Sequence, residues 1–341
     1  MALVTDIWAQ NAWGLVDFQE EVVERMEFRP QLLGGLNIFE PIYSRSRTIA
    51  IAERNRTMTM IPTSEMGAPP EELTPEGARL RTFNTSRLAK GSTIYAAELA
   101  SVAALPFELQ TREVTQEVTD RSGQIMVDLE LTWEHMRFGA VQGKVLDADG
   151  STIIDWYDFW GMTPPAEVNF ALSTATTDVR KKCRDVKRAM MLAAKGAWNP
   201  GARVVALCGD TFFDLLVNHT QYKETKLGTD RASSLEGIEG FSAVDFEDIT
   251  FINFRGTDDG SSLSIATDKA RFFPVGMRGA FKVGFSPASE FKPYLNQRAR
   301  EYYGLILADT SGRDAWDRVE IYSYPLFICT RPEMLQSGKA A

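Results

Sequence analysis

Apolar residues between residues 111 and 142 recur at spacings of three, four or seven, which is the period of one face of an α-helix. The pattern predicts a single long amphipathic helix that ends near residues 139–143. Gly123 lies inside it and costs roughly 1 kcal/mol relative to alanine. The apolar stripe consists of Val114, Val118, Ile125, Leu129, Trp133, Met136 and Ala140.

A second amphipathic helix is predicted over residues 178–195, and Asn199-Pro200-Gly201 ends it. Its outer face is strongly basic. A basic helix face is usually a solvated surface, and contact with nucleic-acid phosphates is the alternative. The basic residues are Arg180, Lys181, Lys182, Arg184, Lys187 and Arg188.

Short runs with strand propensity surround these helices. Lys144–Leu146 and Thr152–Trp156 flank the turn sequence Asp147-Ala148-Asp149-Gly150 and predict a β-hairpin. A buried strand over Arg203–Cys208 leads through Gly209-Asp210 into a helix over Thr211–His219. Further strands are expected at Ile249–Phe254, Leu263–Ala266, Ala280–Phe285 and Val319–Thr330. The predicted fold class is α+β.

Residues 1–43 have the pattern of an arm that stays outside the core. They hold seven acidic residues and two arginines, for a net charge of −5. Asp17–Met26 is compatible with a short amphipathic helix, whereas Pro30 and Gly34-Gly35 are expected to interrupt regular structure.

Residues 44–95 have the pattern of a long projecting β-loop. Strand-like stretches near Ile49–Ile51, Thr57–Ile61 and Arg79–Tyr95 flank a tip rich in proline and glycine at residues 66–77. The segment holds eight basic and five acidic residues, a net charge of +3, and few large apolar side chains. A long loop without a core of its own needs a partner surface to become ordered.

The composition of the 341-residue chain is that of a soluble globular protein, with 44% hydrophobic and 24% charged residues. No apolar run approaches the ~18–20 residues of a membrane-spanning helix, and the first 20 residues show no secretory signal pattern. The formal net charge of −9 argues against a broad nucleic-acid-binding face. Three scattered cysteines argue against a disulfide framework and fit a reducing compartment.

Candidate chemistry is sparse. The only two histidines, His135 and His219, fall in different predicted helices, so no zinc site is expected, and His135 with Glu134 is interpreted as a helix-surface pair. No nucleophile elbow, phosphate-binding loop or dinucleotide fingerprint is present. The acids from Asp147 to Asp158 only partly match a calcium loop, since position twelve is not Glu, and a hairpin turn is the preferred interpretation. We therefore predict no catalytic residues, no cofactor and no metal.

Several longer motifs resemble those of the lambda-type phage major capsid proteins, the capsid E family. The helix-to-hairpin stretch Thr132–Gly161 reads TWEHMRFGAVQGKVLDADGSTIIDWYDFWG, and Ser323–Leu335 reads SYPLFICTRPEML. Gly279–Phe285 with Ser286-Pro287-Ala288, the Met66–Pro70 turn and Arg81–Tyr95 also fit. The similarity spans roughly residues 32–335.

This resemblance implies the Hong Kong 97-type capsid fold. The expected division is an N-terminal arm (1–43), an extended E-loop (44–95), a peripheral domain with spine helix and hairpin (96–164), an axial domain (165–295), and a return to the peripheral domain (296–341). It further implies an icosahedral head of hexamers and pentamers, double-stranded DNA bound without sequence specificity, and scaffold and decoration proteins as further partners. The expected location is the virion, with assembly in the host cytoplasm and no membrane.

Two other functions stay open at this point. One is a cellular nanocompartment shell of the same fold, and the other is a cytosolic enzyme with a site built on Asp147, Asp149 and Glu134. For a shell, the opposite charges of arm and loop predict inter-subunit ion pairs. The predicted contacts are Glu20, Glu21, Glu24 and Glu27 with Arg45, Arg79, Arg81 and Arg87. The loop's only lysine, Lys90, lies far in sequence from its tip, so no lysine crosslink is expected.

Overall fold

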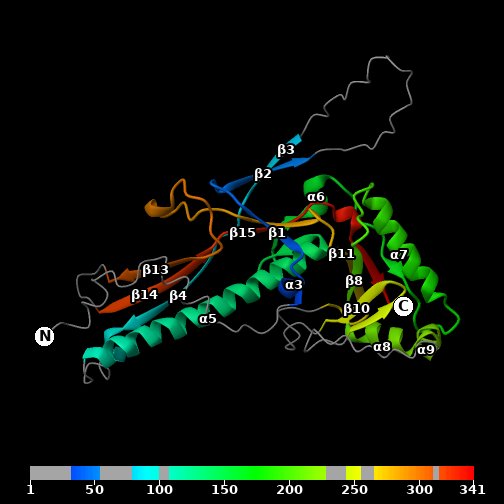
Figure 1. Cartoon of the computed structure of the whole chain (residues 1–341), viewed down its shortest axis with the longest axis horizontal. Helices are drawn as coiled ribbons and strands as arrows, with labels where there is room; N and C mark the ends of the chain where they lie inside the picture. The colour runs from blue at the N-terminus through cyan, green and yellow to red at the C-terminus, as the bar shows by residue number, and fades with distance from the viewer. Residues whose placement is uncertain (1–31, 54–78, 100–106, 228–242, 255–264, 310–314) are drawn as a thin grey trace, which may run out of the picture.

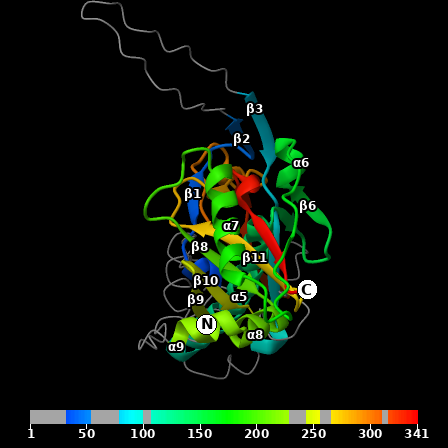
Figure 2. The same cartoon turned by 90° about the vertical axis from the view of Figure 1, so that its right-hand side faces the viewer.

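A computed structural model describes residues 32–53, 79–99, 107–227, 243–254, 265–309 and 315–341. Helices and β-sheets are both present, as the α+β prediction requires. One long helix runs along a three-stranded sheet, and a second, compact unit at its far end holds a six-stranded sheet with helices (Figure 1). A two-stranded hairpin projects away from both (Figure 2).

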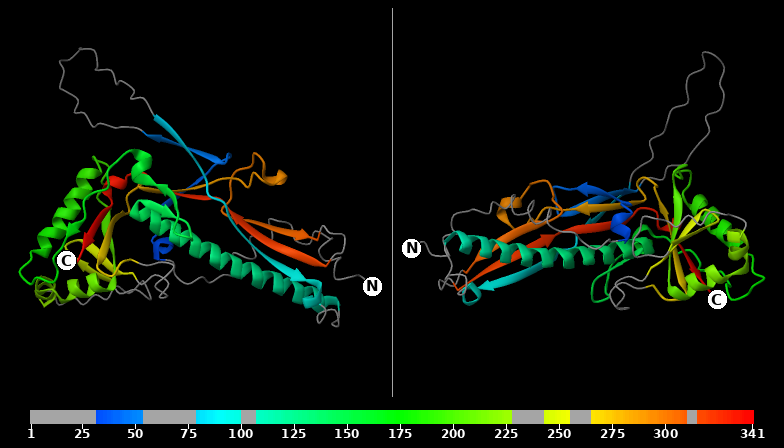
Figure 3. Two further views of the ribbon diagram at one scale, coloured as in Figure 1. Left: turned by 180° about the vertical axis from the view of Figure 1, so that it is seen from behind. Right: turned by 60° about the horizontal axis from the view of Figure 1, so that its bottom comes forward.

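The long helix is α5, Phe107–Gln142, and its predicted apolar stripe forms the core wherever side chains are described. Val118, Ile125 and Leu129 pack against the sheet formed by β13 (Tyr303–Ala308), β14 (Trp316–Ser323) and β4 (Leu88–Tyr95), in the order β13-β14-β4. Figure 3 shows the helix following this sheet along its length. Trp133, Met136 and Ala140 are buried in a larger cluster nearer the helix end.

Residues 32–43 contribute Leu32, Leu33, Ile38 and Phe39 to the core, so the prediction that the arm extends to residue 43 is wrong for this part. Leu32–Gly35 form the short helix α3, and β1 (Phe39–Tyr43) pairs in parallel with β12 (Phe281–Phe285), which pairs with β15 (Pro325–Cys329). Phe39 lies 5.4 Å from Phe281 and 5.3 Å from Phe327 between ring centroids. The apolar residues on both sides of Gly34-Gly35 outweigh the break, because burial stabilises them.

The compact unit is a six-stranded sheet in the order β7-β16-β11-β8-β10-β9. Strand β8 (Arg203–Cys208) is buried on both faces, which explains its uninterrupted apolar sequence. Val204, Ala206 and Cys208 face α7 (Val179–Ala193) and α8 (Asp210–Asn218), whereas Val205 and Leu207 join the core around α5. The other elements are β7 (Val168–Asn169), β9 (Ala243–Phe246), β10 (Ile249–Asn253), β11 (Lys269–Val275), β16 (Gln336–Lys339) and α9 (Thr220–Leu227).

Three predicted strand positions need correction. Ile265 and Ala266 are not in a strand, and residues 263–264 lie outside the described part of the chain. The strand is β11 instead, whose Lys269, Arg271 and Pro274 hide it from an apolar pattern. Val319–Thr330 is two strands, β14 and β15, and Arg79–Tyr95 is also two, β3 (Arg79–Asn84) and β4.

The packing also shifts the expected boundary between the two units. The last strand, β16, pairs with β11 and β7 in the six-stranded sheet and does not return to the α5 side. Strand β12, expected in the axial unit, pairs with β1 and β15 beside α5. The chain therefore crosses between the units again near each of these strands.

Both predicted hairpins are confirmed where the structure describes them. Strands β5 (Lys144–Leu146) and β6 (Thr152–Asp155) are antiparallel, with Gly150 at φ 82° in the turn, and α6 (Trp156–Trp160) follows. Strands β2 (Thr48–Glu53) and β3 pair from Thr48–Asn84 to Glu53–Arg79. The predicted strand Thr57–Ile61, the turn at residues 66–77 and the helix Asp17–Met26 lie outside the described residues.

Candidate assembly surfaces

The β2–β3 hairpin is fixed to the body through Arg81. Its guanidinium donates to the carbonyl oxygen of Phe159 and lies 5.5 Å from the centroid of the Phe159 ring and 5.9 Å from that of Trp160. A cation over an aromatic face is attracted by the ring quadrupole. Arg81 therefore already holds contacts within its own chain, at helix α6.

Arg87, between β3 and β4, is engaged in the same way. Its Nε donates to Oε1 of Glu290 at 2.8 Å, its guanidinium lies 5.1 Å from the Tyr322 ring centroid, and the Tyr324 hydroxyl donates to the same carboxylate. Burial opposes ionisation of Glu290, but these donors outweigh it and hold its pKa below the ordinary value. Arg87 thus anchors the loop that follows β12.

The remaining predicted contact residues are placed only in part. Arg45 is exposed in the turn between β1 and β2. Arg79 occupies the β3 position opposite Glu53. Glu20, Glu21, Glu24 and Glu27 lie outside the described residues, so their pairing with the arginines stays a prediction.

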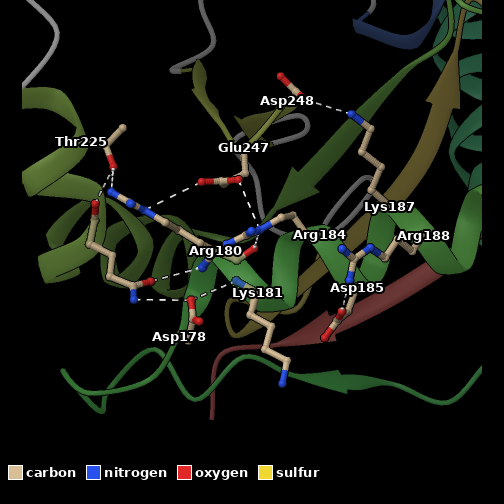
Figure 4. Close-up of polar contacts among 11 residues, drawn as sticks. Asp178, Arg180, Lys181, Arg184, Asp185, Lys187, Arg188, Thr225, Glu247 and Asp248 are labelled. Carbon is tan, nitrogen blue, oxygen red and sulfur yellow. Dashed lines mark hydrogen bonds and ion pairs between the residues drawn. The ribbon is translucent and has the colours of Figure 1, made fainter.

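The basic face of α7 is balanced by acids of its own chain (Figure 4). Glu247 lies 3.8 Å from Arg180 and 3.6 Å from Arg184, and Lys187 Nζ lies 2.9 Å from Asp248. These two acids form the β9–β10 turn with positive φ angles of 51° and 61°, a region that favours glycine. The contacts favour the solvated-face interpretation of α7 over a nucleic-acid surface.

Further contacts fix the start of α7. The Asp178 side chain accepts from the backbone N–H of Lys181 at 3.0 Å and so caps the helix. On the same turn, Arg180 donates to the Thr225 hydroxyl at 2.6 Å (Figure 4). Arg188 pairs with Asp185 at 3.5 Å.

Glu134 is buried, so the predicted surface pair with His135 is wrong. Its carboxylate accepts the backbone N–H of Leu33 at 2.6 Å and of Gly34 at 3.2 Å, and Arg137 lies 3.2 Å away. Burial raises the pKa of Glu134, against the lowering effect of the Leu33 N–H and Arg137. This carboxylate fastens α3 to the spine-like helix α5.

The acids of the proposed enzyme site serve separate structural roles. Asp147 accepts the N–H of Ala148 and Asp149 that of Ser151, each at 2.8 Å, within the exposed β5–β6 turn. Glu134 instead lies buried under α3. Within the described ranges, no group of three or more His, Cys, Asp or Glu side chains is arranged to hold a metal ion.

Two further predictions concern the lysine of the loop and membrane-spanning helices. Lys90 lies in β4, where its ammonium contacts Asp128 of α5. Among the helices described, none is both long and apolar enough to cross a membrane.

Comparison with protein families assigns the chain. The profile described as phage major capsid protein E matches residues 19–340. The chain belongs to this family. It is therefore a shell-forming structural protein of the virion, and neither a nanocompartment shell nor an enzyme is favoured.

Solved structures agree on the capsid fold. A putative capsid protein of a prophage of E. coli CFT073 is 15% identical, with a TM-score of 0.56 over 96% of this chain and 99% of that one. The capsid of Cyanophage A-1(L) is 9% identical, with a TM-score of 0.50 over 93% and 94% of the two chains. No curated relative matches the sequence. The fold is the Hong Kong 97 type that the sequence resemblance implied.

The sequence did not reveal the acids that fix helix α3, the loop after β12 and helix α7 within this capsid subunit. Glu290 and Glu247 stand in no motif, and Glu134 lies in the family-like stretch Thr132–Gly161 without any sign of its role. Their partners are 203, 67 or 63, and 101 positions away, respectively. Only Glu134 had a sequence feature that indicated burial, because it directly follows Trp133 of the apolar stripe.

Proposed function

We propose that this capsid protein assembles as hexamers and pentamers into the icosahedral head of a tailed phage, which encloses double-stranded DNA. The projecting β2–β3 hairpin supports this proposal most directly. Its base packs on the body through the buried Ile49, but its two strands extend away from the body, and a two-stranded hairpin on its own is marginally stable in water. A neighbouring subunit supplies the surface that such a hairpin lacks.

The packaged DNA is confined by the shell rather than gripped by this chain. The formal net charge is −9, and Arg180, Arg184 and Lys187 of α7 already face Glu247 and Asp248. A net negative chain repels phosphate, and the paired cations reduce the basic face that the described part of α7 could offer to DNA. Scaffold and decoration proteins are further proposed partners, and assembly takes place in the host cytoplasm before the protein resides in the virion.

Arm-to-loop ion pairs between neighbouring subunits remain part of this proposal, with Arg45 and Arg79 as the arginines to test. Reversing Arg81 or Arg87 would disturb contacts within one chain. Arg45→Glu with Arg79→Glu should impair assembly, and Glu20→Arg with Glu24→Arg should partly restore it. Salt should weaken the contact, because the screening length falls from about 10 Å at 0.1 M to about 3 Å at 1 M.

The decisive experiment is light scattering and negative-stain microscopy of the full chain, expressed alone and with its genomic neighbours. We expect capsomers or closed shells, with nuclease-resistant double-stranded DNA in particles purified from a phage infection. A monodisperse 38 kDa species under every assembly condition would overturn the proposal. Shells that hold a protein cargo without nucleic acid would instead favour the nanocompartment.

A further inference from the structure

A cavity of about 450 Å³ lies where the end of α5, the β5–β6 hairpin and strands β11 and β16 meet. Phe138 and Leu146 contribute apolar walls, whereas His135, Lys144, Tyr157 and Arg271 contribute hydrogen-bond donors. None of its lining residues in the described chain is an acid, although the protein as a whole is acidic.

Several hydrogen-bond donors that line this cavity still have free positions among the described residues. Arg271 is half-buried on β11, and within the described residues its guanidinium has no hydrogen bond or ion pair. The buried His135 Nε2 also has no partner there. Lys144 pairs with Asp155 at 2.8 Å but stays 55% exposed, so its ammonium retains free donors. Buried cations and polar groups are normally paired, so this set is suited to an anionic oxygen.

One acidic segment of the chain immediately precedes a helix, α3, that is bonded next to this cavity. Helix α3 is fastened to Glu134, the residue before His135, and the cavity-lining part of α5 extends only about 10 Å from His135 to Gln142. The eight residue-to-residue steps from Glu24 to Leu32 span at most about 28 Å. The chain that precedes Leu32 can therefore bring a carboxylate to the cavity.

The chemistry of that segment matches the cavity. Residues 17–27 carry five acids and one arginine, and they also contain Val22, Val23 and Met26. Carboxylates suit Arg271 and Lys144, and the apolar side chains suit the walls around Phe138 and Leu146. We propose that residues 17–27 dock in this cavity of their own chain, with a glutamate carboxylate against Arg271 and His135.

This docking would use the same glutamates as the proposed arm-to-loop pairs. The two contacts therefore exclude each other within one subunit at one time. The inference does not depend on shell formation, because it concerns a single chain and is read out residue by residue.

The test is zero-length carbodiimide crosslinking of the full-length protein, followed by mass spectrometry. The reagent joins a carboxylate to a contacting amine, so we expect an amide link from Lys144 to Glu20, Glu21, Glu24 or Glu27. The Lys144–Asp155 link serves as a control within every sample, since that pair is present regardless of docking. Mixing ¹⁵N-labelled and unlabelled subunits identifies links between chains by their hybrid mass.

Arg271→Gln should reduce the arm link about tenfold and leave the Lys144–Asp155 link unchanged, because it removes a charge-assisted bond. Arg203→Gln is the matched control, since Arg203 is an exposed arginine on β8 of the same sheet, away from the cavity lining. An excess of the free peptide 17–29 should also suppress the link, whereas the peptide with its glutamates changed to glutamine should not.

Competition with the free peptide leaves the protein sequence intact, so the test stays valid even if Arg271→Gln perturbs folding. The proposal is overturned if Lys144 links only to Asp155, if the arm links form solely between differently labelled chains, or if neither Arg271→Gln nor the peptide reduces them. If these links do not form, the expectation of shells in the microscope is unaffected. The docking proposal and the assembly proposal can therefore be refuted separately.

Discussion

Removing the Glu134 carboxylate should detach α3 from the long helix. Glu134→Ala leaves the buried Leu33 N–H without its acceptor and deprives Arg137, whose side chain is only 15% exposed, of its ion pair. An unsatisfied buried N–H costs about 1–3 kcal/mol. Breaking a buried ion pair from one side costs up to about 3–5 kcal/mol, and less here because Arg137 keeps its contacts with the Trp133 and Phe327 rings. Gly34 is half-exposed, so water can replace the hydrogen bond that its N–H makes to Glu134. We expect a loss of about 3–5 kcal/mol in the free energy of unfolding.

Glu134→Gln separates the hydrogen bond from the charge. The amide oxygen can still accept from Leu33, so the loss should be smaller, about 1–2 kcal/mol. The raised pKa of Glu134 means that the folded state binds its proton more tightly than the unfolded chain does. Stability of the wild type should therefore rise as pH falls through the folded-state pKa toward about 4.5, and this gain should be missing in Glu134→Gln.

Amide hydrogen exchange at Leu33 and Gly34, together with denaturant unfolding, measures both effects. Glu117→Ala on the same helix is the control, because its surface pair with Arg121 is one of two that Arg121 makes and should be worth about 0.2–1 kcal/mol. If Glu134→Ala leaves Leu33 protected and costs no more than the Glu117 variant, the carboxylate does not fasten α3.

Two further substitutions test the packing and the loop anchor. Gly139→Ala should destabilise by about 1–3 kcal/mol, since its Cβ would lie 2.6 Å from the Lys144 carbonyl oxygen, whereas Gly123→Ala in open space on the same helix should stabilise by about 0.5–1 kcal/mol; thermal unfolding compares them. Glu290 has a lowered pKa, so its contribution is present above about pH 4.5 and lost as pH falls through the folded-state value. Glu290→Gln should flatten that part of the stability–pH profile, and an unchanged profile would show that Arg87 does not rely on this carboxylate.

The regular elements were predictable because their sequence periods are strong. The stripe from Val118 to Ala140 has the helical period over more than five turns, and its described members are buried. The run Val204–Cys208 is uninterrupted because both faces of β8 are covered. In contrast, β11 carries Lys269 and Arg271 among its apolar residues, and these cations conceal a strand whose alternate positions pack into two different cores.

Segment boundaries were harder to predict, because local breakers do not reveal tertiary burial. Gly34-Gly35 suggested an irregular arm, yet Leu33 is fully buried and its N–H is bonded to a residue 101 positions away. Strand β16 similarly follows the α5-side strand β15 in sequence but pairs with β11. Such pairings depend on which surfaces remain open after the rest of the chain has packed.

Charge counting by segment overstated the number of available cations for a related reason. The count of +3 for residues 44–95 treats each arginine as available, but Arg81 lies on α6 and Arg87 on Glu290, a residue 203 positions away. The charges of Lys187 and Asp248, which are 61 positions apart, offset each other in the same manner. The informative cations are those that keep free hydrogen-bond donors within the described part of the chain, because these can attract a further carboxylate. Arg271 meets this condition in a cavity whose described lining contains no acid, and that is why it, rather than the more numerous arginines of the loop, is the first residue to test as the receptor of the acidic arm.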